Sequence, residues 1–206
     1  MIVCGLTGGV GMGKSTAAGF LGRHGVPIVD TDELARELVQ PGQPALGEIQ
    51  SAFGSRVIGP GRELNREELA RIIFADIQAR RAVEAILHPR IQERWLTRID
   101  TWRAEDRPIA VVVIPLLFET RAEAHFDRIL CVACSVAAQR ERLKARGWTP
   151  EQIDQRNAAQ LPVEQKIDRA DFVIWTEGGL ENQSAQIKRV LASLDWQDGQ
   201  PFPRDN

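Results

Sequence analysis

The chain has 206 residues, of which 43% are hydrophobic and 26% are charged, and its formal net charge is −2. This length suits one domain, and the small net charge excludes a general electrostatic attraction to nucleic acid or to an anionic membrane. Because no apolar run approaches the roughly 18 residues of a membrane span and the N-terminus lacks a signal-peptide pattern, we expect a cytoplasmic protein that binds no membrane.

The chain begins with a buried strand expected at residues 2–6, a glycine-rich segment and a helix expected at residues 15–21. Between them, Gly8 to Ser15 fit G-x-x-x-x-G-K-[ST], the motif of a phosphate loop. Glycines let successive main-chain N–H groups converge on phosphate oxygens. Lys14 is expected to reach the β- and γ-phosphates of ATP as a catalytic cation, and the Ser15 hydroxyl to hold Mg²⁺. The expected ATP-binding residues of this segment are Gly8, Gly9, Gly11, Met12, Gly13, Lys14, Ser15 and Thr16.

The second apolar run, residues 26–29, is followed by two aspartates. Asp30 with Glu33 resembles a capping box, which gives Asp30 a structural role as a helix cap. Asp32 has no such role. Because ligands of an open parallel sheet bind beyond the carboxyl ends of its strands, Asp32 is the candidate general base toward an acceptor hydroxyl.

Residues 33–106 are expected to form a helical insertion, because nearly eighty residues separate the second strand from the third. Asn65 with Glu68 is a second capping-box-like start. Ile91, Trp95, Ile99 and Trp102 repeat at helical spacing as one apolar stripe, which indicates core packing more than an aromatic ligand platform.

Three further apolar runs, at residues 109–114, 128–134 and 171–175, complete a set of five strands. Their near-continuous apolar character predicts an α/β fold with a five-stranded parallel sheet covered on both faces, as in a phosphate-loop kinase. We expect one kinase unit with a core at residues 1–32, 107–135 and 163–195, and a frayed tail at residues 196–206. Cys131 and Cys134 form C-x-x-C without a second pair or a nearby histidine, so we interpret them as core residues in preference to a redox or metal pair.

Residues 136–162 are rich in cations and are expected to form a helical lid. Ser135 and Thr149 are the expected caps of its two helices. Arg142 and Arg146 share one helix face, because they are four residues apart. A solvated basic face is the alternative, but transfer of a phosphoryl group requires cations around the transferred oxygens. We therefore assign Arg142 to catalysis, and Arg142, Arg146 and Arg156 to ATP binding.

Taken together, these motifs resemble those of the dephospho-CoA kinase family. The matching pieces cover nearly the whole chain. They are the phosphate loop, D-x-D-x-x-A-R at residues 30–36, Pro41-Gly42, Phe53-Gly54, L-H-P at residues 87–89, P-L-L-F-E at residues 115–119, Q-x-x-R-x-x-x-R at residues 139–146, R-x-x-x-Q at residues 156–160, Lys166 and Ala170-Asp171.

The resemblance implies ATP-dependent phosphorylation of the ribose 3′-hydroxyl of dephospho-CoA, giving coenzyme A. It implies that the insertion holds dephospho-CoA, with Asp32, Arg36, His88 and Leu116 as acceptor-binding residues. Considered without the resemblance, His88 is a structural ring beside a proline that starts a helix. The implied partners are ATP, Mg²⁺ and dephospho-CoA, with no nucleic acid and no obligate protein partner.

The sequence also departs from the family's pattern. Met12 replaces a small residue, and we expect its side chain to point outward. Val113 stands where many members carry Asp, so Glu119 or Asp32, acting through water, is the candidate to complete the Mg²⁺ site. Thr176 takes the place of a frequent Asn.

Two other functions stay open from the residues alone. One is a kinase for another nucleoside or nucleotide, and the other is a nucleotide-binding regulator that transfers no phosphate. A GTPase is disfavoured because the chain lacks N-K-x-D.

Overall fold

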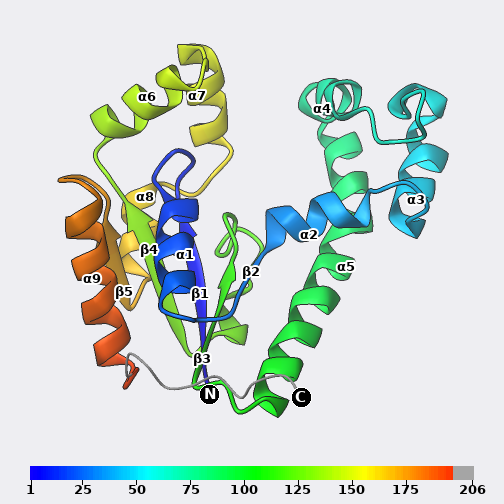
Figure 1. Ribbon diagram of the computed structural model, residues 1–206. Coiled ribbons are helices and arrows are strands. Elements are labelled where there is room, and N and C mark those ends of the chain that lie inside the picture. The colour runs from blue at the N-terminus through cyan, green and yellow to red at the C-terminus, as the bar shows by residue number, and fades with distance from the viewer. Residues whose placement is uncertain (197–206) are drawn as a thin grey trace. The chain divides into compact units, whose positions relative to one another are not determined.

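A five-stranded sheet in the order β2-β3-β1-β4-β5 organises the computed structural model, which describes residues 1–196 (Figure 1). The strands are β1 (Ile2–Gly8), β2 (Ile28–Asp30), β3 (Ile109–Val113), β4 (Arg128–Ala133) and β5 (Phe172–Trp175). β1 pairs in parallel with β3 and with β4, and β4 pairs in parallel with β5. The predicted α/β fold is therefore confirmed.

Helices cover the sheet because its central strands are almost continuously apolar and buried. All five residues of β3 are buried, as are the last six of β1. One cluster joins alternate residues of the central strands to α1 (Lys14–Arg23) and α9 (Leu180–Ser193). On the other face, a Cβ added to Gly5 would lie 2.5 Å from the Leu117 side chain, so residues after β3 pack directly against β1. Because β1, β4 and β5 are parallel neighbours, their carboxyl ends lie next to one another at one edge of the sheet.

Four of the described helices begin where the sequence places caps. The Asp30 carboxylate accepts from the N–H of Asp32 at the start of α2 (Thr31–Leu38), and Asn65 caps α4 (Arg66–Ala75). Ser135 caps α6 (Val136–Ala145), and a full capping box at Thr149 opens α7 (Pro150–Ala158). The other helices are α3 (Pro44–Phe53), α5 (Ile77–Ala104), α8 (Val163–Asp168) and the 3₁₀ turns η1 (Ser55–Val57) and η2 (Glu123–His125).

The chain divides into two compact units. One holds Met1–Val29 together with the chain from Ile99 onward, and the other holds Asp30–Arg98. The second unit has its own core, to which the end of α2, α3, η1, α4 and the start of α5 contribute side chains: Val39, Leu46, Ile49, Val57, Leu69 and Val83. Among the described helices, none combines the length and the apolar character needed to cross a membrane.

Two expectations differ from the structure in detail. Pro89 does not start a helix but lies inside α5, where its missing N–H leaves one carbonyl of the preceding turn without its helical donor. Packing of residues on both sides, Val83 before it and Trp95 after it, maintains the helix through this point. Trp196, placed in the frayed tail, is buried in the same cluster as α1 and α9. The rest of that tail lies outside the described residues.

Candidate active site

The phosphate loop, residues 8–15, connects β1 to the first turn of α1. The carbonyl of Gly13 accepts from the N–H of Ala17, so the helix begins directly after the last loop glycine. The Lys14 ammonium donates to the carbonyl oxygens of Gly8 and Gly9, at 2.8 and 3.0 Å. The lysine is thereby folded back over the start of the loop, and the exposed Ser15 and Thr16 follow it on the first turn.

Met12 does not point outward as expected. It is only 3% exposed, and its Sδ lies 2.8 Å from the position that a Cβ on Gly9 would take. The flexible thioether fills the space beneath the loop that the bare backbone of Gly9 leaves open. Met12 therefore contributes support beneath the loop and an accepting carbonyl, while its side chain is turned away from solvent.

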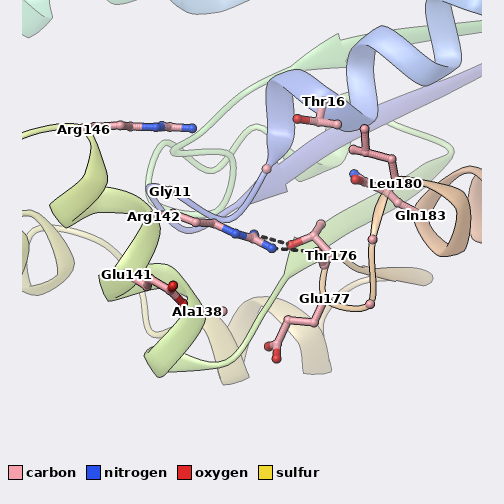
Figure 2. Close-up of a pocket in the computed structure, with 13 residues that line it drawn as sticks. Gly11, Thr16, Ala138, Glu141, Arg142, Arg146, Thr176, Glu177, Leu180 and Gln183 are labelled. Atoms are coloured by element: carbon pink, nitrogen blue, oxygen red, sulfur yellow. Dashed lines mark hydrogen bonds between the residues drawn. The ribbon is translucent and has the colours of Figure 1, made fainter.

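A pocket of about 500 Å³ opens beside the loop, within the range typical of small-molecule sites (Figure 2). It lies between α6, the start of α1 and the turn that joins β5 to α9. Its lining residues are Gly11, Gly13, Thr16, Ala138, Glu141, Arg142, Arg146, Thr176, Glu177, Gly178, Gly179, Leu180 and Gln183. The structure thus brings four predicted nucleotide residues of the loop and lid (Gly11, Gly13, Thr16, Arg146) to one cavity with Arg142.

Arg142 is held in this pocket by both arms of its guanidinium. Nη1 donates to Thr176 Oγ1 and Nη2 donates to the Thr176 carbonyl, each at 2.7 Å, and Figure 2 shows the side chain pointing at Thr176. Thr176 is 7% exposed, and its hydroxyl donates to the Met12 carbonyl at 3.0 Å. The departure at Thr176 therefore links the lid arginine to the phosphate loop.

The other cations of the lid lie apart from Arg142. Arg140 pairs with Asp154 on the outer side of the lid, and Lys144 is exposed. Arg146 lines the pocket one turn beyond Arg142. Arg156 lies over the Trp148 ring, at 5.9 Å from its centroid, and is not among the residues that line the pocket.

Each end of the lid is attached to the core by a main-chain N–H and a carboxylate. At one end the N–H of Ser135 donates to Glu177, and the backbone and side chain of Ser135 lower the pKa of that carboxyl. At the other end the N–H of Leu161 donates to Glu119 Oε1 at 2.7 Å. The same oxygen lies 2.8 Å from the ammonium of Lys166, which is fully buried. The sequence offered no local signal for either attachment.

The second unit carries three predicted acceptor residues. Asp32 and Arg36 are exposed on α2, where the N–H of Asp32 donates to the Asp30 carboxylate at 2.8 Å. His88 is exposed on α5, so it is not the packed structural ring that the sequence considered alone suggested. The fourth predicted acceptor residue, Leu116, belongs to the first unit and is half-buried in the turn after β3.

A divalent metal would find few donors in the protein itself. Within residues 1–196, no group of three or more His, Cys, Asp or Glu side chains could hold a metal ion. Val113 is 2% exposed and packs in the core. The exposed Ser15 hydroxyl, next to Lys14 at the start of α1, suits a metal that arrives with the phosphates of its nucleotide.

A family model and two curated relatives point to the same family. The family model described as dephospho-CoA kinase matches residues 2–182. A dephospho-CoA kinase from Anaeromyxobacter dehalogenans is 44% identical, covering 98% of this chain and 97% of that protein, and one from Bdellovibrio bacteriovorus is 37% identical, covering 93% and 95%.

Solved structures agree in fold. The crystal structure of a Thermus thermophilus protein superposes with a TM-score of 0.79 at 34% identity, covering 94% of this chain and 97% of that one. A dephospho-CoA kinase from Campylobacter jejuni gives a TM-score of 0.69 at 21% identity, covering 93% and 96%, which shows the shared fold. The sequence match and the phosphate-loop geometry together establish that the chain belongs to the dephospho-CoA kinase family.

Proposed function

We propose that this protein transfers the γ-phosphate of ATP to the ribose 3′-hydroxyl of dephospho-CoA. The proposal rests on one observation: residues of the phosphate loop line the same pocket as Arg142. The match of the chain to the dephospho-CoA kinase family supports it. One part of the site offers main-chain N–H groups and an ammonium to phosphates. The other offers a cavity of about 500 Å³ for the nucleoside.

The donor half of the reaction uses the first unit. Lys14 would leave the carbonyls of Gly8 and Gly9 to meet the β- and γ-phosphate oxygens, which are stronger acceptors because they are charged. Arg142 and Arg146 would offset the negative charge that spreads over the transferred group. Arg156 would join them after leaving its contact with Trp148.

The metal is proposed to be Mg²⁺, bound through the Ser15 hydroxyl and the phosphates. It would neutralise charge on the β- and γ-phosphates. Oε1 of Glu119 already accepts from Lys166 and from the N–H of Leu161, so we disfavour Glu119 as a metal residue. Asp32, acting through water, remains the alternative carboxylate.

The acceptor half is assigned to the insertion, residues 33–106, together with Asp32 and Leu116. A carboxylate that is hydrogen-bonded to the ribose hydroxyl can accept its proton as the new bond to phosphorus forms, and we assign this role to Asp32. Exposed cations such as Arg36 suit the phosphates of dephospho-CoA. His88 completes the proposed acceptor surface without a role in proton transfer.

We also propose a cytoplasmic enzyme that acts on small molecules, with no nucleic acid and no obligate protein partner. The net charge of −2 supports the absence of a nucleic-acid partner. The three free and buried thiols suit a reducing compartment.

The test is a phosphotransfer assay with MgATP and a panel of acceptors: dephospho-CoA, free nucleosides and nucleoside monophosphates. We expect dephospho-CoA to give the highest kcat/KM and ³¹P NMR to place the new phosphate on the 3′-oxygen. A higher kcat/KM for another acceptor would replace this function by that of a different nucleoside or nucleotide kinase. ATP binding without turnover on any acceptor would favour a regulator.

A second arm of the assay concerns Asp32→Asn, which is nearly isosteric but cannot take the proton. We expect kcat to fall by about 10²–10⁴-fold with ATP affinity nearly unchanged. Titration with Mg²⁺ distinguishes the two roles of Asp32. Recovery of activity at high metal concentration would assign the carboxylate to the metal in place of the base.

A further inference from the structure

Both main-chain polar groups of Val10, in the middle of the phosphate loop, are bound by glutamines of the lid. The N–H of Val10 donates to Gln160 Oε1 at 3.1 Å, and its carbonyl accepts from Gln139 Nε2 at 2.7 Å. Gln139 belongs to α6, and Gln160 follows the end of α7. Two segments of the lid, α6 and the turn after α7, thus bind the loop at the same residue, Val10.

The chemistry of the main chain fixes the orientation of both amides. An N–H can only donate and a carbonyl can only accept, so Gln160 must present its oxygen and Gln139 its nitrogen. Asn157 completes the arrangement. Gln139 Nε2 donates to Asn157 Oδ1 at 3.0 Å, and Asn157 Nδ2 donates back to Gln139 Oε1 at 3.2 Å. The three amides and Val10 form what we call the amide clamp.

Burial makes this clamp costly to break. Gln139 is 2% exposed and Val10 is half-buried, so the removal of the Gln139 donor would leave the Val10 carbonyl without this partner in a partly buried site. Networks of this kind rigidify the groups they join when every member is satisfied.

The clamp also connects the loop to Arg142. Gln139 precedes Arg142 by three residues on α6, so the two side chains share a helix face. Gln139 binds the carbonyl of Val10, while Arg142 reaches the carbonyl of Met12 through the Thr176 hydroxyl. Between them, Gly11 has a φ of +73°, and a Cβ there would lie 2.7 Å from Leu143 of the same helix. One helix therefore sets the path of three successive loop residues.

We propose that Gln139 and Gln160, with Asn157, are positioning residues that hold the phosphate loop and the lid arginine in the geometry that accepts a triphosphate. The inference rests on the proposed function only in taking ATP as the ligand of the loop. These hydrogen bonds keep the loop and the base of the lid in a constant relative position. If they are lost, α6 can shift relative to the loop, and the Arg142 guanidinium is then displaced from the phosphates.

The test replaces each glutamine by glutamate, which has nearly the same shape. A carboxylate cannot donate a hydrogen bond, as Gln139 does, but it can accept one, as Gln160 does. The carboxylate introduced by Gln139→Glu cannot donate to the Val10 carbonyl, but the protonated carboxyl can. We expect kcat/KM for ATP to fall roughly tenfold to a hundredfold at pH 8. Relative to the unsubstituted enzyme at each pH, the activity should rise severalfold as the pH is lowered to 6, because burial favours the neutral carboxyl. Gln139→Leu, which cannot donate at any pH, should show the loss without the recovery.

Gln160→Glu should behave differently. Its carboxylate still accepts from the N–H of Val10, and this hydrogen bond favours the ionised carboxyl, so its activity should stay near that of the unsubstituted enzyme and vary little between pH 8 and pH 6. Gln155→Glu, at an exposed side chain of α7, is the matched control for adding a charge to the lid and should follow the unsubstituted enzyme throughout. Normalisation to the parent removes the titration of Glu141 and other groups around the pocket.

Equilibrium binding of ATP is measured on the same variants, so the clamp is tested even if dephospho-CoA is not the acceptor. A loss of affinity and of kcat/KM in Gln139→Glu that recovers at pH 6, with little loss in Gln160→Glu at either pH, supports the proposal. Parallel pH trends in the two variants, a loss in Gln139→Glu that does not vary with pH, or kinetics of Gln139→Glu equal to those of Gln155→Glu would overturn it. Should Gln139→Glu fail to fold, Gln160→Leu, which cannot accept from the N–H of Val10, decides alone: it should bind ATP more weakly, and unchanged affinity would overturn the proposal.

Discussion

At the scale of single residues, Gly8 shows how tightly the phosphate loop is built onto the sheet. Its φ is +146°, and a Cβ there would lie 2.2 Å from the carbonyl oxygen of Val132. Gly8 is still paired with Val132 in the register of β1 and β4. The loop therefore starts while the chain remains in the sheet, and only glycine fits that transition.

We expect Gly8→Ala to lower the free energy of unfolding by more than about 1 kcal/mol and to reduce ATP binding, because both the φ and the contact oppose a side chain. Gly47→Ala is the matched control. Gly47 lies in α3 with nothing within 4 Å of an added Cβ, so alanine there should be neutral or stabilising by up to about 1 kcal/mol. Urea denaturation measures both. Equal effects of the two substitutions would contradict the tight start of the loop.

Arg142 makes two hydrogen bonds to one residue through two separate nitrogens of its planar guanidinium. Arg142→Lys keeps the charge but loses the planar fork that reaches both the hydroxyl and the carbonyl of Thr176. We expect kcat to fall roughly tenfold or more, with a smaller change in ATP affinity. Arg140→Lys, on the outer side of the lid, should leave both values unchanged. Steady-state kinetics on the pair of variants decides between a bound lid arginine and a solvated basic face.

At the scale of elements, the sequence was informative wherever the determining residues are neighbours in the chain. The caps at Asp30, Asn65, Ser135 and Thr149 were each predicted from a few letters and are confirmed. All five strands are predicted from their apolar runs, which are most continuous where burial on both faces requires it, as in β3. The ends of the strands differ from the predicted ends by at most two residues.

Contacts between distant parts of the chain could not be predicted in this way. The hydrogen bond from Gln139 to Val10 joins residues that are 129 positions apart, and that from Arg142 to Thr176 joins residues 34 apart. Met12 was placed outward because its neighbours in sequence say nothing of the space beneath Gly9. Pro89 was placed at a helix start because tertiary packing, which carries α5 past it, is not visible in local propensity.

The strands β1 and β4 carry two thiols whose ionisation is suppressed. Burial, with smaller contributions from the carboxylates of Asp127 and Asp171, raises the pKa of Cys4 to about 12. Burial also raises the pKa of Cys131 to about 11, although the ammonium groups of Lys166 and Lys14 act in the opposite direction. Thiolate, the reactive form, is therefore scarce at pH 8. We expect the folded protein to resist alkylation of these cysteines by iodoacetamide at pH 8 and to label all three cysteines in denaturant, as read by mass. Rapid labelling of Cys4 or Cys131 in the folded state would contradict their place in the core.

The same shifts give a dependence of stability on pH. Both thiols ionise near their ordinary value of 9.0 when unfolded and only at higher pH when folded. Their contribution to stability is thus fully present below pH 9 and is lost as the pH rises from 9 through the folded values.

At the scale of the whole molecule, the division of the chain at Val29 and Ile99 separates two kinds of predicted site residue. The residues assigned to ATP lie in the first unit. Of the residues assigned to the acceptor, Asp32, Arg36 and His88 lie in the second, which has its own hydrophobic core, and Leu116 lies in the first. Each unit should therefore respond mainly to its own ligand.

Hydrogen exchange read by mass spectrometry tests this division of labour. A ligand that binds only the folded form protects the segments it contacts and stabilises. We expect ATP to slow exchange in residues 8–16 and 176–183, and dephospho-CoA to slow exchange in residues 30–98. Protection of only the first unit by dephospho-CoA would contradict the assignment of the insertion to the acceptor.

The two carboxylate attachments of the lid have a consequence for how this enzyme family can vary. Glu177 and Glu119 hold the main-chain N–H groups of Ser135 and Leu161, and a main-chain N–H is offered by every residue except proline. The lid segment from Ser135 to Leu161 is therefore attached at both ends through main-chain groups, with a further contribution from the Ser135 side chain at one end, and can be regarded as a cassette. Exchange of this cassette between relatives would need to preserve the amides that reach Val10 and the arginine that reaches Thr176, and could leave its outer surface free to diverge.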